Sequence, residues 1–180
     1  KLIGEQAIMR VMPNLPRQLG RRVSVLYANS RCSSAQIETA TALNNAVGYT
    51  HIVNSEDELD RVTTLAGSGS GYAFEITRCS IDSAIEMGFS LPTARELVLN
   101  TQGGSIELAA SAESVKGLRN STTSKNSTTA SGLTLLIQGS KLSVFLEATV
   151  SVAYQRALAL PLFLLSLNND MQKIHNDILC

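Results

Sequence analysis

The chain is poor in the residues that build disulfide frameworks, metal sites and charged binding surfaces. Its 180 residues include three cysteines and two histidines, and the 17% of charged residues sum to zero net charge. The cysteines, Cys32, Cys79 and Cys180, are odd in number and too far apart for a disulfide framework or a metal-binding spacing. Two histidines, His51 and His175, leave little material for a triad or a metal site. The zero net charge argues against nucleic acid as a partner.

A long hydrophobic run is also missing, which bears on membranes and location. The densest apolar stretch, residues 157–167, contains Pro161 and Ser166 and is shorter than the roughly 20 residues of a membrane span. No signal peptide opens the chain, which begins with Lys1, and widely spaced thiols fit a reducing compartment. We therefore expect a cytoplasmic protein without a membrane partner, and a first residue other than methionine indicates a processed or partial chain.

The first 55 residues carry the alternating pattern of an α/β sheet. Strands are predicted over residues 23–28 and 49–53, a helix over 33–47, and a proline-rich turn at 13–16. Ser34 is the expected N-cap of the helix. With the short apolar run of residues 7–12 before the turn, this makes three short strands and one helix. These are too few to close a sheet on their own, so this part is predicted as a residual α/β piece.

Beyond residue 55 the hydrophobic pattern becomes helical. Ser55 begins a capping signal, and later helices are expected over residues 72–88, 91–110 and 142–160. Gly103-Gly104 marks either a break or a close helix contact. Small side chains dominate these helices, which favours an interlocked bundle or dimer, with an ordinary monomeric bundle as the alternative. The predicted fold is mainly α, with domains 1–55, 56–160 and a divergent tail, 161–180, that does not continue the helical pattern.

A loop rich in serine and threonine, residues 118–133, precedes an apolar helical stretch. Hydroxyl groups and free backbone N–H groups at a helix N-terminus form an anion site, because the helix dipole and the unpaired donors both favour negative charge. A carboxylate or a phosphate would suit such a site. The alternative is a flexible polar linker with an N-cap.

Three segments together carry a resemblance to one family. Residues 10–16 (R-V-M-P-N-L-P) resemble the R-V-M-P-N-T-P run of pyrroline-5-carboxylate reductases, residues 63–72 (T-T-L-A-G-S-G-S-G-Y) resemble their T-A-L-S-G-S-G-P-A-Y run, and residues 118–133 resemble their L-R-x-x-V-T-S-P-G-G-T-T-I-A-G-L run. The segments occur in the family's order, and the resemblance extends over about residues 5 to 160.

The resemblance implies a reductase of proline biosynthesis. Such enzymes reduce 1-pyrroline-5-carboxylate to L-proline with NADPH or NADH, the reduced forms of NADP and NAD. They combine a Rossmann domain with a helical dimerisation domain. Residues 1–55 would then be the C-terminal remnant of the Rossmann domain, and a homodimer or larger homo-oligomer is expected. The glycines of residues 67–71 do not supply the G-x-G-x-x-G cofactor fingerprint, because Tyr72 stands at the third glycine and a helical segment precedes them.

The resemblance also assigns site residues. Ser124, Thr128 and Thr129 would hold the substrate carboxylate, and Pro13 and Asn14 would lie beside the nicotinamide of the cofactor. No residue is assigned as an acid or base, because hydride transfer to a protonated imine depends on orientation. No metal is expected.

The chain departs from the family pattern at several of these positions. Residues 125–127 (K-N-S) replace Pro-Gly-Gly, and glycines permit the positive φ angles and close backbone approach of a tight carboxylate site. Arg78 stands where the family has a glutamate, and Arg22 replaces a glycine. These changes leave an alternative open, namely a divergent, non-catalytic relative that acts only as a dimerising helical module. A small-carboxylate binding module without redox chemistry is a third possibility.

Overall fold

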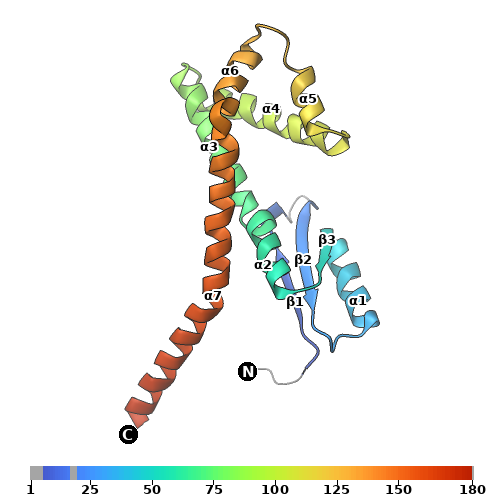
Figure 1. Ribbon diagram of the computed structural model, residues 1–180, viewed down its shortest axis with the longest axis vertical. Helices are drawn as coiled ribbons and strands as arrows, with labels where there is room; N and C mark the ends of the chain where they lie inside the picture. Colours follow the sequence, from blue (N-terminus) through green and yellow to red (C-terminus); the bar gives the residue numbers. More distant parts are fainter. Residues whose placement is uncertain (1–5, 17–19, 180) are drawn as a thin grey trace. The chain divides into compact units, whose positions relative to one another are not determined.

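The computed structural model describes the backbone of residues 6–16 and 20–179, and the surroundings of side chains as far as residue 160. The chain forms two compact units (Figure 1). The first consists of Lys1–Ser70 together with Ala148–Cys180, and the second of Gly71–Glu147. The architecture is mainly α with one small sheet, as predicted from the sequence.

The sheet of the first unit has the strand order β1-β2-β3, and its strands are β1 (Met9–Pro13), β2 (Arg22–Ala28) and β3 (Gly48–Val53). The central strand, β2, pairs antiparallel with β1 and parallel with β3, and helix α1 (Ser34–Asn45) connects β2 to β3. Gly48 opens β3 with φ +155°, and a Cβ atom there would stand 1.9 Å from the carbonyl oxygen of Arg22. Only glycine allows this close approach, so Gly48 is required for the pairing of β3 with β2.

The core of the first unit lies between the sheet and helix α2 (Glu56–Val62). Val25, Val53 and Leu59 are almost completely buried there. Because side chains alternate along a strand, Ser24 and Leu26, which are also fully buried, point to the other face of β2. Helices α1 and α2 lie on the two sides of the sheet in Figure 1. Met12 at the end of β1 and Val62 at the end of α2 both pack against this core, which therefore holds these two elements together.

Serine side chains start five of the helices by accepting a hydrogen bond from a first-turn N–H group. The capping residues are Ser33, Ser55, Ser90, Ser114 and Ser127. The prediction of Ser34 as the first cap was wrong by one residue. Ser33 accepts from the N–H of Gln36, and the Gln36 side chain in turn accepts from the N–H of Ser33, which completes a capping box one position earlier.

The helical part begins with a π-helical turn, η2 (Thr63–Gly67), that follows α2. It continues through α3 (Gly69–Glu86), α4 (Leu91–Ser111), α5 (Val115–Ser121), α6 (Thr128–Ile137), the 3-10 turn η3 (Gln138–Ser140) and α7 (Lys141–Leu179). Of the two alternatives predicted for Gly103-Gly104, the break is wrong, because α4 runs through both glycines. The helical backbone of α7 continues past residue 160, although the apolar pattern of the sequence is less regular there.

The helices leave much apolar surface uncovered within one chain. In α3 and α4, Ile81 and Ala94 are buried, whereas Ile106 is 68% exposed, and Leu135 on α6 is 66% exposed. Among the described residues, the stretch Thr128–Leu160 is long and apolar enough to cross a membrane by length and composition alone. Gly139 and Ser140, with φ angles of +64° and +56°, interrupt that stretch between α6 and α7.

Candidate substrate-binding loop

The hydroxyl-rich segment forms the junction between α5 and α6. Ser124 lies in the loop, where its carbonyl oxygen accepts a hydrogen bond from the N–H of Ser127 at 3.2 Å. Thr128 and Thr129 are the first two residues of α6, and their side chains are exposed, as is that of Ser124. The structure therefore places all three predicted substrate residues on one solvent-accessible junction between a loop and a helix.

The N-terminus of α6 is electrostatically suited to an anion. Its first turn contains no acidic residue, a property shared with α1, α4 and α5, whereas the first turn of α2 carries Glu56, Asp57 and Glu58. Acidic side chains in a first turn neutralise the positive end of the helix dipole, and α6 lacks this compensation. The N–H groups of Thr128 and Thr129 have no acceptor within the helix because the first turn precedes any i−4 carbonyl. These donors and the helix dipole can act together on a carboxylate.

The loop needs only one unusual backbone angle. Asn126 has φ +63°, while Ser127 has φ −77°, an ordinary value for any residue. Asparagine is one of the few residues other than glycine that enters the left-handed region readily. The replacement of Pro-Gly-Gly by residues 125–127 therefore keeps a sharp turn, because the positive φ falls on the asparagine and the serine is free to cap α6.

We expect Asn126→Val to lower the free energy of unfolding by about 1–2 kcal/mol, because a β-branched residue is strained at positive φ. Urea denaturation followed by far-UV circular dichroism measures the change. Asn126→Gly is the matched control and should leave the stability unchanged or slightly higher. Equal stability of the valine variant and the original chain would contradict the left-handed conformation at this position.

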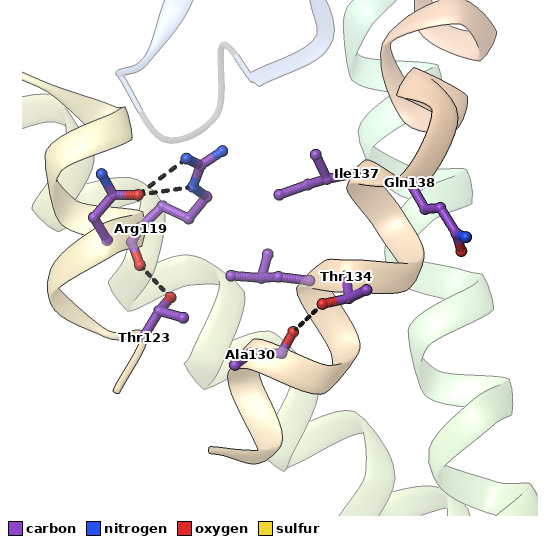
Figure 2. Close-up of a pocket in the computed structure, with 8 residues that line it drawn as sticks. Arg119, Thr123, Ala130, Thr134, Ile137 and Gln138 are labelled. Atoms are coloured by element: carbon purple, nitrogen blue, oxygen red, sulfur yellow. Dashed lines mark hydrogen bonds between the residues drawn. The ribbon is translucent and has the colours of Figure 1, made fainter. Parts of the chain in front are cut away.

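A groove of about 510 Å³ runs between α5 and α6, next to the loop (Figure 2). Its walls carry Arg119, Asn120, Thr123, Ala130, Leu133, Thr134, Ile137 and Gln138. Figure 2 shows the Thr123 hydroxyl donating to the carbonyl oxygen of Arg119, at 2.7 Å. None of the three predicted substrate residues lines this groove. Sequence reasoning missed both the groove and the cap Ser127, whose hydroxyl accepts a hydrogen bond from the N–H of Ala130. A serine directly before a helical segment is the ordinary sequence signal for a cap.

The two predicted cofactor residues lie in the first unit, at the end of β1. Pro13 is the last residue of the strand and is exposed, and Asn14 follows it. The Asn14 side chain accepts a hydrogen bond from the N–H of Val23 at 2.9 Å and donates one to the carbonyl oxygen of Ala66 at 3.3 Å. The predicted substrate residues belong to the second unit.

The glycines at residues 67–71 do not form a nucleotide-binding loop of the Rossmann type. Gly67 ends the π-helical turn and Gly69 begins α3, so a helix, and not a strand, precedes them. A Rossmann phosphate loop requires a strand before the glycines and a helix after them. The local structure therefore agrees with the sequence-based conclusion that this run is not the cofactor fingerprint, and the run opens α3 instead.

Arg78, the charge reversal on α3, is exposed and bound within its own helix. Its Nη2 atom lies 2.6 Å from Oε1 of Glu75, and its Nη1 atom lies 2.5 Å from Oδ2 of Asp82. The hydrogen bonding that the Arg78 guanidinium donates to Glu75 is the main cause that raises the pKa of Arg78, and the same contact lowers the pKa of Glu75. The arginine is thus accommodated by neighbours at i−3 and i+4, which are adjacent on a helix surface.

Comparison with known proteins gives a consistent result. The family model for the pyrroline-5-carboxylate reductase dimerisation domain matches residues 56–160. A pyrroline-5-carboxylate reductase of Pseudomonas aeruginosa is 35% identical over 154 residues, which cover 85% of this chain and 56% of the relative. One from Synechocystis is 31% identical over 154 residues, covering 85% of this chain and 57% of the relative.

Solved structures show the same similarity. A pyrroline-5-carboxylate reductase from Coxiella burnetii superimposes with a TM-score of 0.79 at 31% identity, covering 88% of this chain and 59% of that chain. A pyrroline carboxylate reductase from Plasmodium falciparum, solved with NADP bound, gives a TM-score of 0.80 at 26% identity, covering 87% and 62%. The chain thus spans somewhat more than half the length of the relatives compared here.

Proposed function

The chain belongs to the pyrroline-5-carboxylate reductase family, and on that premise we propose that it serves the reduction of 1-pyrroline-5-carboxylate to L-proline with NADPH or NADH. In this reaction a hydride adds to the carbon of the C=N bond, the nitrogen keeps a proton, and the dinucleotide leaves oxidised. A cytoplasmic location is part of the proposal, since the chain combines scattered thiols with a soluble substrate and cofactor.

The observation that carries the proposal is the uncompensated N-terminus of α6. The substrate has one carboxylate, and Thr128 and Thr129 offer two free N–H groups and two exposed hydroxyls at a positive helix end. Ser124 contributes a third exposed hydroxyl from the loop. Holding the carboxylate at this junction fixes the ring in one orientation, which is what a hydride transfer without protein acid or base requires.

The part of the chain described here fits the nicotinamide side of a cofactor site better than the phosphate side. Pro13 is exposed at the end of a strand, and ligands of open α/β sheets bind outside strand ends. The cofactor, when bound, supplies the hydride. Pro13 and Asn14 would shape the surface on which the nicotinamide rests, and the glycine run at residues 67–71 offers no pyrophosphate loop.

A homodimer or larger homo-oligomer is also proposed. Within one chain, exposed apolar side chains such as Ile106 and Leu135 lie on α4 and α6, inside the region matched by the dimerisation family model. Many exposed apolar side chains in one region are typical of a protein interface. A second copy of the chain is the partner that the family assignment favours, and its contact would bury these side chains.

L-Proline should raise the melting temperature of the chain even without cofactor, because a ligand that binds only the native state stabilises it. At about 100 times its Kd the ligand adds about 2.7 kcal/mol, or roughly 5–10 °C for a protein of this size. Thr128→Val and Thr129→Val should each reduce the shift by more than half, because an exposed hydroxyl at the carboxylate is lost. Differential scanning fluorimetry gives the result directly.

Thr134→Val is the matched control, since Thr134 lies on the same helix and its hydroxyl donates to the carbonyl oxygen of Ala130 at 2.9 Å. That variant should keep the full shift. A chain that dimerises but shows no shift with proline would instead support the alternative of a non-catalytic dimerising module. A shift with proline, combined with no reduction of pyrroline-5-carboxylate by the full-length protein, would support the carboxylate-binding alternative.

A further inference from the structure

Helix α2 is connected to α3, the first long helix, by the π-helical turn η2. In η2 the N–H of Ser68 donates to the carbonyl oxygen of Thr63 at 3.1 Å, a bond that spans five residues. Thr64 is 2% exposed, and its hydroxyl donates to the carbonyl oxygen of Arg61 at 2.7 Å. π-Helical turns are rare, energetically poorer than α-helix, and found frequently at functional sites. Some other contact must therefore hold this turn in place.

Asn14 supplies one such contact from the end of β1. Its backbone N–H donates to the carbonyl oxygen of Val23 at 3.1 Å, and its Oδ1 atom accepts from the N–H of Val23 at 2.9 Å. Its Nδ2 atom donates to the carbonyl oxygen of Ala66 at 3.3 Å. One half-buried amide thus connects β1, β2 and the π-helical turn, across 52 residues of sequence.

Met12 supplies a second contact to the same turn. A Cβ atom on Gly67 would stand 3.1 Å from Sδ and 3.2 Å from Cε of Met12, which is closer than ordinary van der Waals contact. The absence of a side chain at Gly67 lets Met12 lie directly on the backbone of the turn. By contrast, a Cβ atom on Gly69 would meet no other atom within 4 Å. The residues on either side of Pro13, Met12 and Asn14, therefore both contact the turn.

We propose that Asn14 is a positioning residue, which acts by fixing the π-helical turn Thr63–Gly67, and with it the start of α3, against the end of β1. Its amide then contributes to the reaction through the shape of this junction and not as a direct ligand of the nicotinamide. The effect on catalysis rests on the proposed function, whereas the effect on the turn does not. Both effects are expected because the Asn14 amide is already engaged: its oxygen accepts from Val23 and its nitrogen donates to Ala66.

Asn14→Asp separates the two bonds of the amide. One carboxylate oxygen can still accept from Val23, but the other replaces the donor to Ala66 with an acceptor, so that bond is lost and repulsion takes its place. In hydrogen exchange measured by mass spectrometry, we expect the amides of residues 63–70 to exchange at least tenfold faster, and those of β2 and β3 to change less than twofold. In the full-length reductase we expect KM for pyrroline-5-carboxylate to rise about tenfold and KM for the dinucleotide less than threefold.

Asn45→Asp is the matched control, because the Asn45 side chain also accepts from a backbone N–H, that of Thr50 at 3.1 Å, within the same unit. It should leave the exchange of the turn unchanged. If Asn14→Asp does not fold, Gly67→Ala tests the same turn from its other contact and should accelerate exchange there, whereas Gly69→Ala should not.

Unchanged exchange at residues 63–70 in Asn14→Asp would overturn the proposal, and so would an equal increase throughout the sheet, which indicates a general loss of stability. A rise in KM confined to the dinucleotide would make Asn14 a direct cofactor ligand and would also overturn it. A full-length protein without reductase activity would refute the proposed function, but the exchange experiment would still decide the role of Asn14 in the turn.

Discussion

Leu59→Ala should lower the free energy of unfolding by about 3 kcal/mol, within the range of roughly 2–5 kcal/mol found for large-to-small core substitutions. Leu59 is 1% exposed and closes the core that α2 forms with Val25 and Val53 of the sheet. Because this core is small, little remains to fill the cavity after truncation. A loss of 3 kcal/mol is a large part of the 5–15 kcal/mol that typically stabilises a domain. Urea denaturation followed by circular dichroism measures it.

Leu43→Ala makes the same chemical change on α1, where the side chain is 70% exposed. Its expected effect is within about 0.5 kcal/mol, as for most surface substitutions. The two variants together isolate burial from helix propensity, since both replace leucine with alanine inside a helix. Similar stabilities for the two variants would mean that α2 does not pack against the sheet as described.

Ile106→Glu and Leu135→Glu should each weaken self-association at least 100-fold. Each apolar side chain contributes about 1.5–3 kcal/mol when it is buried, and an unpaired carboxylate placed in the same interface adds a desolvation penalty. A change of 100-fold corresponds to about 2.8 kcal/mol. Sedimentation velocity across a concentration series should show a dimer or larger oligomer for the original chain and a monomer for both variants.

Leu43→Glu is the matched control for this experiment, because Leu43 is as exposed as Ile106 but lies outside residues 56–160. It should leave the oligomeric state unchanged. If the original chain and both variants were all oligomeric, the apolar faces of α4 and α6 would not form the interface between the copies. A monomeric original chain would remove the basis for the proposed homo-oligomer altogether.

Local patterns in the sequence were sufficient for β2 and β3 and for the starts of α2 and α4. Val25 and Val53 lie in runs of β-branched residues, and alternation along such runs identifies a strand without knowledge of its neighbours. Ser55 was found in the same way, because a cap is a contact between residues close in sequence. Resemblance to the family, and not periodicity, indicated the candidate substrate residues.

Features that depend on contacts distant in sequence could not be predicted. The π-helical turn is held by Asn14 and Met12, about 50 residues earlier, and nothing near Gly67 in the sequence signals it. A break at the glycine pair in α4 was considered and does not occur, for another reason. Each glycine costs only about 1 kcal/mol in a helix, which a helix of 21 residues can absorb without a break. At the loop, the assignment of positive φ to Asn126 also required the folded backbone.

The outer edge of β3 has a practical consequence for the isolated chain. Among the described residues β3 pairs with β2 alone, and its six residues include neither a charged side chain nor a proline. Tyr49 and Ile52 are 62% and 45% exposed on it. An uncharged edge rich in β-branched and aromatic residues acts as a template for strand pairing between molecules. Concentrated preparations of this chain are therefore prone to aggregate through β3, whereas β1 is protected at its edge by Arg10 and Pro13.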